Sequence, residues 1–276
     1  MRELTLKEFQ DFSLGILKDV HDFCVKNNLK YSLAYGTLIG AIRHKGFIPW
    51  DDDVDIIMPR PDYDRFCATY KSELFKVSAF EVDPDCRITY ARVYDDNRTV
   101  VKTRSPWNLK EHGAWIDIFP LDAVEDDYNV FYKRILKINR IFNIAQFGRG
   151  SARHFSSRYS NKVNFTTLVK KILFLNGLLV PTFIKKVIKL SKKLEYGSTQ
   201  HWGMTVFIDT YGIKDYHHNS LFEDIIDVDF EQYSFKSLKG YDEYLRNLYG
   251  DYMQLPPEKD RKPRQSYMHV YWKNDK

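Results

Sequence analysis

A run of acidic residues leading into an apolar segment constrains this chain more than any other feature of its sequence. Trp50-Asp51-Asp52-Asp53-Val54-Asp55 is followed directly by Ile56-Ile57-Met58. Aspartate is a poor strand former, so such a cluster at the start of a β-strand is locally unfavourable. Because side chains alternate across a strand, Asp53 and Asp55 are expected on one face with their carboxylates close together. Two such carboxylates repel each other unless a divalent ion such as Mg²⁺ lies between them.

A bend of small residues upstream favours this metal interpretation over a solvated acidic turn, which is the alternative for the acidic run alone. Residues 31–34 are expected to form a short strand, Tyr35-Gly36-Thr37 a tight turn, and Thr37 the cap of a helix that runs to about residue 43. Backbone amides at such a helix start can hold phosphate oxygens. Together the bend and the acidic run predict a site for a metal ion and a phosphate group.

A third carboxylate fits the same chemistry. Asp117 stands alone among the apolar residues of 114–119, which read as a buried strand. A lone buried aspartate is costly unless it is hydrogen-bonded or bound to a metal ion. If this strand neighbours residues 54–58, Asp117 completes a cluster of three carboxylates and could act as a general base on an acceptor hydroxyl. A hydrogen-bonded aspartate in a turn is the alternative, and Asp122, after Pro120, reads as a loop residue.

Cationic side chains accompany these carboxylates. Arg43-His44-Lys45 lies between the bend and the acidic run, and Arg92 lies between two tyrosines on a predicted strand. Cations at such positions can stabilise charge on a leaving phosphate, although each could equally be an ordinary surface charge. The predicted metal ligands and catalytic residues are Asp53, Asp55 and Asp117, and the predicted substrate-binding residues are Gly36, Thr37, Arg43, Lys45, Trp50, Asp52 and Arg92.

Strands that alternate with helices predict an α/β or α+β fold, with a mixed sheet flanked by helices. A capping box at Thr5 opens a helix that should end near residue 27, and Pro61 opens another that should run to about residue 75. A loop at 46–50 should precede the strand at 54–58, and a helix at 241–249 should end at Gly250. Further β-rich runs are expected at 76–82, 87–94 and 99–102.

The positive charge of the chain is concentrated in one region. Residues 129–194 hold fifteen Lys and Arg and no Asp or Glu, which leaves 27 basic against 37 acidic residues elsewhere. We therefore expect a catalytic core at 1–125, a basic helical insert at 126–200 and a C-terminal segment at 201–276 that completes the core. Paired lysines beside apolar clusters at 172–175 and 178–180 suit a helix pair on an anionic membrane surface. A packed subdomain with a cationic face is the alternative.

Other sequence features suggest a cytoplasmic protein. If the basic insert binds a membrane surface, the protein is expected at the inner face of that membrane. The first eight residues mix both charge signs, unlike a signal peptide, and the most apolar stretch, at 172–184, is shorter than the roughly 20 residues a spanning helix needs. The three cysteines have no metal-ligand spacing and are expected to be reduced and buried. The basic residues carry no recognisable nucleic-acid motif, so no nucleic-acid partner is expected.

At these residues the chain resembles the LicD family, which includes the fukutin-related proteins. The run from Tyr35 to Asp55, YGTLIGAIRHKGFIPWDDDVD, is close to the family signature throughout. Residues 116–122, IDIFPLD, resemble its second block, and residues 249–257, YGDYMQLPP, resemble its C-terminal block. The similarity covers about residues 5 to 260 and is least evident at 126–200. One departure is Tyr35, where family members often have another glycine.

The resemblance implies a nucleotidyltransferase fold in which Asp53 and Asp55 bind Mg²⁺ or another divalent ion such as Mn²⁺ and Asp117 is the third carboxylate. It also implies transfer of phosphocholine, or of a polyol phosphate, from CDP-choline or another CDP-alcohol, with release of CMP. The implied acceptor is a glycan or lipid-linked glycan of the teichoic-acid, capsule or lipopolysaccharide type. A choline donor needs aromatic faces near its cation, and Trp50 is one candidate.

Two other enzyme classes use a similar arrangement of carboxylates. A nucleotidylyltransferase attaches the nucleoside monophosphate itself and releases pyrophosphate. A metal-dependent glycosyltransferase also binds a nucleotide diphosphate through Asp-x-Asp, but it does not require the bend at Gly36-Thr37. Both remain alternatives to phosphocholine transfer on the sequence alone.

Overall fold

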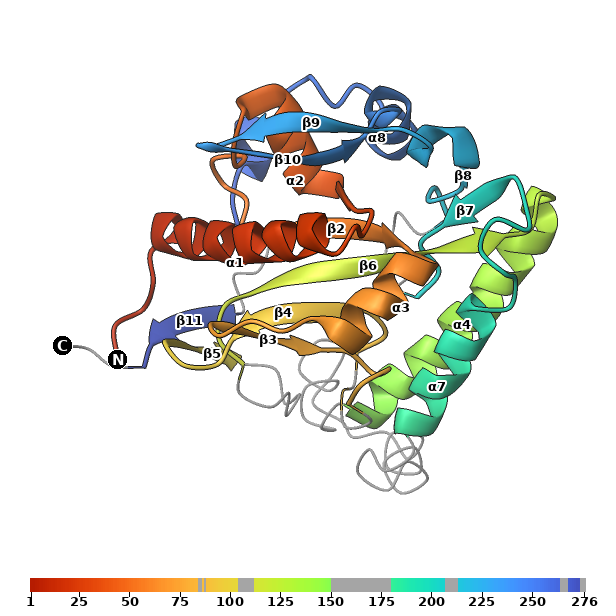
Figure 1. Cartoon of the computed structure of the whole chain (residues 1–276), viewed down its shortest axis with the longest axis horizontal. Helices are drawn as coiled ribbons and strands as arrows, with labels where there is room; N and C mark the ends of the chain where they lie inside the picture. The colour runs from red at the N-terminus through yellow and green to blue at the C-terminus, as the bar shows by residue number, and fades with distance from the viewer. Residues whose placement is uncertain are drawn as a thin grey trace.

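The computed structural model describes the chain apart from residues 84, 85, 87, 104–111, 150–179, 207–212, 264–267 and 274–276. A mixed sheet lies at its centre (Figure 1), with strand order β1-β2-β6-β4-β3. These strands are β1 (Ser32–Leu33), β2 (Asp55–Pro59), β6 (Trp115–Val124), β4 (Ala91–Asp95) and β3 (Phe75–Ser78). β2 and β6 run parallel, and the other pairs in this order are antiparallel. The prediction of a mixed sheet flanked by helices is confirmed.

The sheet continues beyond the far end of β6. β7 (His201–Gly203) pairs with residues 122–124 of β6, and β8 (His217–His218) pairs with β7. Two smaller sheets complete the β structure. One is the hairpin of β9 (Ile225–Phe230) and β10 (Tyr233–Leu238), and the other joins β5 (Thr99–Thr103) to β11 (Met268–Trp272). The strand predicted at 114–119 is therefore longer than expected, and Asp122 lies within it and not in a loop.

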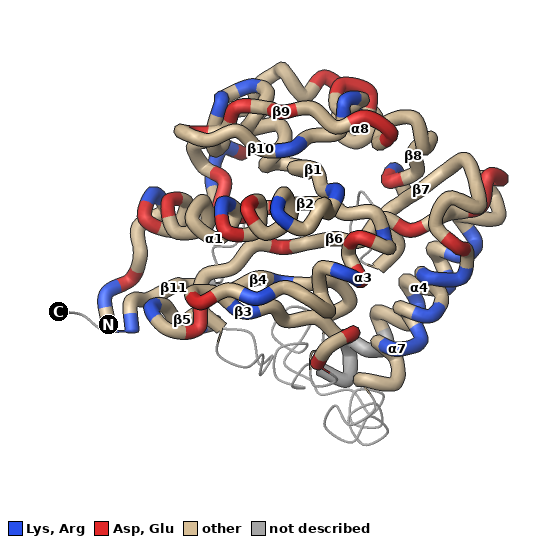
Figure 2. The backbone as a smooth tube through the Cα atoms, viewed as in Figure 1, with Lys and Arg blue, Asp and Glu red and all other residues tan. Residues whose placement is uncertain are grey.

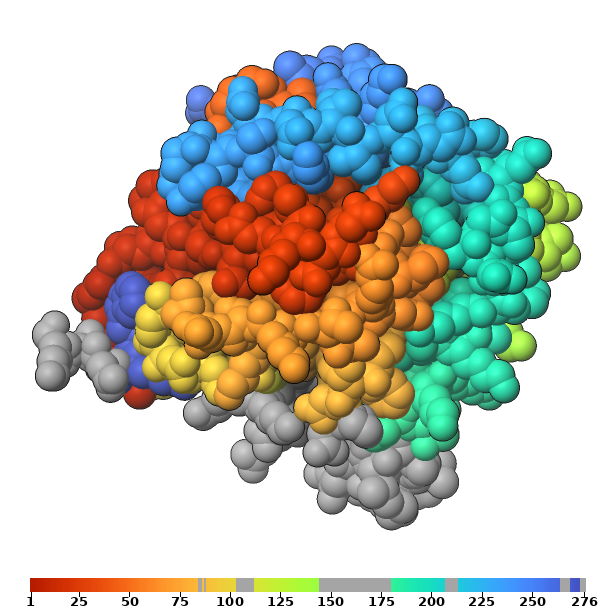
Figure 3. Space-filling model, in the orientation of Figure 1, coloured from red at the N-terminus to blue at the C-terminus, as the bar shows by residue number. Residues whose placement is uncertain are grey.

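Helix α1 (Leu6–Lys26) and helix α3 (Arg60–Thr69) pack against the central sheet. The capping box at the start of α1 is present, because Thr5 Oγ1 accepts from the Glu8 amide while the Glu8 carboxylate accepts from the Thr5 amide. α1 ends where predicted, but α3 ends at Thr69 and not near residue 75, because the extended backbone of Tyr70 stops it. In the space-filling view, residues of β9 and β10 lie against α1 (Figure 3). The rings of His21 and Phe235 pack together there, with centroids 5.3 Å apart.

The described part of the basic region contains helices α4 (Tyr128–Arg149) and α7 (Val180–Ser191), which pack on each other at one side of the molecule (Figure 1). Ile138, Ile141, Phe142 and Val187 form the core between them. The apolar cluster predicted at 172–175 lies outside the described residues. Helix α8 (Tyr241–Tyr249) ends at Gly250 as predicted. No helix in the described ranges is long and apolar enough to cross a membrane.

Candidate active site

Two of the predicted carboxylates lie side by side in the central sheet. In the parallel pairing of β2 with β6, Asp55 is the register partner of Asp117, and in the pairing of β4 with β6, Arg92 is the partner of the same Asp117. Neighbouring strands lie about 4.8 Å apart, and register partners point to the same side of a sheet. Asp55, Asp117 and Arg92 therefore form one row across three strands.

Arg92 is bound within this row. Its Nε donates to Asp117 Oδ1 at 2.7 Å and its Nη2 donates to the hydroxyl of Tyr90 at 3.0 Å. Its guanidinium also lies over the ring of Trp115, with the carbon 4.6 Å from the ring centroid. Burial lowers the pKa of Arg92, but the charge of Asp117 and the hydrogen bonds to Asp117 and Tyr90 raise it above its usual value, so this side chain stays cationic. One of the clustered carboxylates is thereby neutralised.

Asp55 remains in an unfavourable electrostatic environment. Burial, followed by the charges of Asp53, Asp117 and Asp51, raises the pKa of the Asp55 carboxyl well above its usual range. Arg92 opposes the shift without cancelling it. A divalent cation among these carboxylates would remove the repulsion, since such ions prefer carboxylate oxygens.

The acidic run contributes three more carboxylates just before β2. Oxygens of Asp51, Asp52 and Asp53 lie within 4.8 Å of one another. The prediction that Asp53 and Asp55 lie on one strand is wrong, because β2 begins at Asp55 and Asp53 precedes it. After burial, the charge of Asp53 is nevertheless the largest cause of the raised pKa of Asp55. The donor set of this region is thus all carboxylate oxygen, which fits Mg²⁺ or Mn²⁺ and not a soft metal ion.

The bend upstream of the acidic run is bonded to it directly. Helix α2 (Tyr35–Ile39) begins at the bend and continues as the π-helical segment η1 (Gly40–His44). The prediction that Thr37 caps this helix was wrong, because the cap position is Ala34 and no side chain bonds there. The Thr37 hydroxyl instead accepts the backbone N–H of Asp55 at 2.9 Å. The bend therefore holds the first residue of β2.

Gly36 and Tyr35 show why the bend needs particular residues. A Cβ on Gly36 would lie 2.7 Å from Asp51 Oδ2, so only glycine lets that carboxylate approach the bend without displacement. Tyr35 has a φ of 46°, a left-handed conformation that costs a non-glycine residue roughly 1–2 kcal/mol. The family resemblance led us to expect a glycine at this position, and here a tyrosine adopts the strained conformation.

The remaining predicted residues have structural partners elsewhere. Nη1 of Arg43 donates to the carbonyl of Tyr252 at 2.5 Å and its Nε donates to His44, so Arg43 joins η1 to the C-terminal segment. Lys45 is exposed, and its carbonyl accepts the N–H of Glu231. Their roles with phosphate stay predictions.

Trp50 is partly buried at the start of the acidic run. The guanidinium carbon of Arg261 lies 5.8 Å from its ring centroid, and the ring of His44 lies 6.4 Å away. A cation is therefore already near the face of this ring, and a contact with a choline cation stays a prediction.

Sequence reasoning left out three residues that contact the site. Asp51 lies against Gly36, and its place in the acidic run was a sufficient signal. Tyr90 accepts a hydrogen bond from Arg92, and its spacing of two residues on one strand was a weaker signal. Asp215 accepts a hydrogen bond from the hydroxyl of Tyr35 at 2.5 Å, and no local sequence pattern predicts this contact.

The comparisons with known proteins agree with this geometry. Residues 28–142, which contain all of the predicted site residues, match the family model described as LicD/FKTN/FKRP, nucleotidyltransferase domain. The chain is 34% identical over 270 residues to the lipopolysaccharide cholinephosphotransferase LicD of Haemophilus influenzae, covering 95% of this chain and 97% of that protein. An uncharacterised protein of Rickettsia typhi is 49% identical over 51 residues, or 18% of this chain and 16% of that protein. A protein of Rickettsia prowazekii, also uncharacterised, is 56% identical over 41 residues, or 15% of each chain.

Proposed function

The chain belongs to the LicD/FKTN/FKRP family and is a transferase, and from that premise we propose that it moves phosphocholine from CDP-choline to a hydroxyl of a lipopolysaccharide precursor. The observation that carries the proposal is the similarity over nearly the whole of both chains to a lipopolysaccharide cholinephosphotransferase. The row of Asp55, Asp117 and Arg92 beside the bend supports it, since it supplies the carboxylates and the cation that phosphoryl transfer requires.

Asp53 and Asp55, with Asp117 as third carboxylate, are the residues we propose to hold a divalent ion, and Mg²⁺ or Mn²⁺ fits their oxygen ligands. Such an ion would neutralise the diphosphate and withdraw electron density from the phosphorus under attack. In the transfer, the acceptor oxygen forms a bond to the phosphocholine phosphorus while the bond from that phosphorus to the bridging oxygen breaks, and CMP leaves. The residues of the chain supply position and charge compensation.

Asp117 is suited to receive the proton of the acceptor hydroxyl. Its Oδ1 is held by Arg92, and no residue in the described part of the chain donates to its Oδ2. The bond from Arg92 orients the carboxylate, which leaves Oδ2 to accept a proton in the transition state. Gly36 and Thr37 are proposed to present backbone amides to the donor phosphates.

The decisive assay incubates the protein with Mg²⁺, CDP-choline and lipopolysaccharide that lacks phosphocholine. Chromatography should detect CMP, and mass spectrometry should detect glycan that has gained phosphocholine. Asp55→Ala and Asp117→Asn should lose turnover, while Asp22→Ala on the exposed side of α1 serves as the charge-matched control. Full turnover in either site variant would contradict the assignment.

The same assay separates the alternatives. Release of CMP from CDP-ribitol or CDP-glycerol, but not from CDP-choline, would replace phosphocholine with a polyol phosphate. Release of pyrophosphate from CTP would identify a nucleotidylyltransferase, and transfer from a nucleotide sugar would identify a glycosyltransferase. Parallel reactions with teichoic-acid and capsule precursors would define the acceptor.

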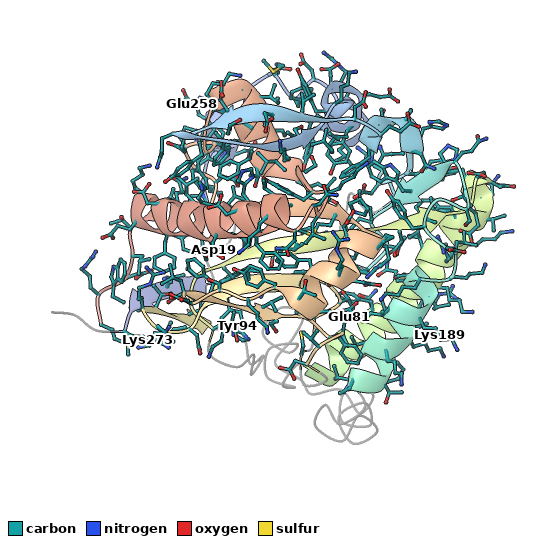
Figure 4. The ribbon with its side chains drawn as sticks, viewed as in Figure 1. Asp19, Glu81, Tyr94, Lys189, Glu258 and Lys273 are labelled. Atoms are coloured by element: carbon teal, nitrogen blue, oxygen red, sulfur yellow. The ribbon has the colours of Figure 1, made fainter. Side chains whose placement is uncertain are left out.

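A second part of the proposal concerns the basic face of α4 and α7, which we assign to peripheral contact with anionic lipid. Figure 2 shows Lys and Arg along both helices. Six of these cations are exposed and have no acidic partner in the described part of the chain: Lys133, Lys137, Arg140, Lys185, Lys186 and Lys189, the last of which is labelled in Figure 4. Tyr132 and Leu136, each 37% exposed, lie on the outer side of α4 as well.

Basic side chains near an anionic bilayer each contribute about 1 kcal/mol at physiological ionic strength, so several together are enough for reversible binding. A lipid-linked acceptor would be reached from such a position. Vesicles of phosphatidylglycerol should therefore pellet the protein at low salt, and vesicles of phosphatidylcholine should not. The triple variant Lys133→Gln, Lys137→Gln, Arg140→Gln should lose most of this binding.

The matched control removes three exposed lysines elsewhere, with the substitutions Lys26→Gln, Lys30→Gln and Lys71→Gln. It lowers the net charge by the same amount and should bind as the unchanged protein does. Equal loss of binding in both triple variants would mean that net charge alone drives association and that α4 has no special role.

A further inference from the structure

The hydroxyl of Tyr35 makes a bond that spans 180 positions of the chain. It donates to Asp215 Oδ2 at 2.5 Å, and both side chains are buried. The ring of Tyr35 also packs edge-on against Phe119, with centroids 5.8 Å apart. Burial, followed by the charge of Asp215, raises the pKa of the Tyr35 hydroxyl well above its usual value, so the hydroxyl remains a donor.

Asp215 is itself held by the central sheet. His217, two residues later, pairs with Trp202 of β7, and β7 pairs with the far end of β6. The backbone fits tightly here, because a Cβ on Gly203 of β7 would lie 2.2 Å from the carbonyl oxygen of Asp215. His217 Nε2 lies 3.2 Å from Asp215 Oδ1, and neither side chain is exposed. The carboxylate that receives the Tyr35 hydroxyl therefore has a fixed position relative to β6, the strand that carries Asp117.

Tyr35 connects Asp215 to the bend on the other side of the site. Its left-handed backbone begins the bend, in which Gly36 lies against Asp51 and the Thr37 hydroxyl accepts the N–H of Asp55. A strained residue persists only where its surroundings hold it in place. The bond to Asp215 and the ring packing on Phe119 and Tyr244 hold Tyr35 in place.

We infer that Asp215 is a positioning residue for the acidic site, acting through Tyr35 to keep the bend and the start of β2 in register with β6. The inference rests on the proposed function only in treating Asp55 as part of the metal site. It adds a residue of the C-terminal segment to a site that otherwise comes from the first 117 residues. Sites of this kind depend on supporting contacts that fix the residues touching the ligand.

Hydrogen exchange tests the inference without any substrate. Tyr35→Phe removes only the hydroxyl, and we expect the amide of Asp55 to exchange about tenfold faster in this variant, because the bend that supplies its acceptor opens more often. The chain offers a matched control: Tyr70 donates to Asp19 Oδ1, also at 2.5 Å, between the end of α3 and α1. Tyr70→Phe makes the same chemical change and should leave exchange at Asp55 unaltered.

Calorimetry with Mg²⁺ alone supplies the second readout. Tyr35→Phe and Asp215→Ala should each weaken Mg²⁺ binding several-fold. The double variant should bind Mg²⁺ no less tightly than the single variant with the lower affinity, because both substitutions break the same hydrogen bond. Asp215→Asn keeps an acceptor oxygen for the tyrosine and should retain more affinity than Asp215→Ala.

Two results would overturn the inference. One is unchanged exchange at Asp55 in Tyr35→Phe, and the other is additive losses of Mg²⁺ affinity in the double variant. Neither measurement involves a donor or an acceptor. Failure to turn over CDP-choline would therefore reject the proposed function and leave the role of Asp215 open to its own test.

Discussion

The buried ion pair of Arg60 and Asp122 offers the sharpest test of what stabilises the central sheet. Arg60, at the junction of β2 and α3, donates from Nε to Asp122 Oδ1 at 2.7 Å and from Nη2 to Oδ2 at 2.9 Å. The Thr205 hydroxyl donates to the same Oδ2 at 2.8 Å. The Arg60 side chain is 8% exposed and the Asp122 side chain 1%. Glu81, labelled in Figure 4, and Asp64 lie farther from the guanidinium, each at 3.5 Å.

The substitution Asp122→Asn leaves the buried guanidinium of Arg60 without its closest charge. Removing one partner of a buried ion pair costs about 3–5 kcal/mol. Because the carboxylates of Glu81 and Asp64 remain 3.5 Å from the guanidinium, we expect the free energy of unfolding to fall by the low end of this range, about 3 kcal/mol. With an unfolding entropy of about 0.6 kcal/mol/K for a chain of this size, the Tm should fall by about 5 °C.

Thermal unfolding of metal-free protein measures this directly. Asp64→Asn is the control, because its pair with the same arginine is longer and Asp64 is 41% exposed, so its loss should lower the Tm by less than about 2 °C. The double variant Arg60→Met, Asp122→Asn should be more stable than Asp122→Asn alone, since the orphaned charge is gone. Equal effects of the two single asparagine variants, or a double variant weaker than both of its parents, would refute the reasoning.

Three further predictions concern the site and the core. Thr37→Val should destabilise the protein by about 1–3 kcal/mol in urea unfolding, because the N–H of Asp55 loses its acceptor, whereas Thr37→Ser should cost clearly less. The three cysteines are buried, and burial raises the pKa of the Cys24 thiol, so a thiol reagent should label them only after denaturation, and rapid labelling of native protein would contradict the packing. The pKa of Asp55 is raised in the fold, so the metal-free protein loses stability as pH rises through that pKa. The gain in Tm on addition of Mg²⁺ should therefore be larger at about pH 8 than at about pH 5.5. An equal gain at both pH values would argue against a cation at Asp55.

Local signals in the sequence predicted the elements whose ends are fixed by neighbouring residues. The capping box at Thr5 and Glu8 gave the start of α1, and Gly250 gave the end of α8. Capping and turn formation involve contacts within a few residues, so they can be read from a short stretch of sequence. The acidic run before an apolar strand likewise predicted a cluster of carboxylates, and oxygens of Asp51, Asp52 and Asp53 do lie within 4.8 Å of one another.

Other expectations failed where a distant partner decided the outcome. Thr37 had the residue type and position of a helix cap, but its hydroxyl accepts from Asp55, eighteen positions later. Asp122 follows a proline and resembles a loop residue, but a long strand continues through Pro120 and a buried arginine receives the carboxylate. In both cases a long-range hydrogen bond outweighs the local preference.

The sequence by itself determined which residues are available for the chemistry: a bend with glycine, a cluster of aspartates at the start of one strand, and one aspartate alone in another. Only the tertiary structure decided that Asp55 and Asp117 are register partners, that Arg92 occupies one oxygen of Asp117, and that Asp215 holds Tyr35. The physical reason is that the pairing of strands more than fifty residues apart is fixed by the burial of the whole core, and a shift of one residue would turn these side chains to the opposite face.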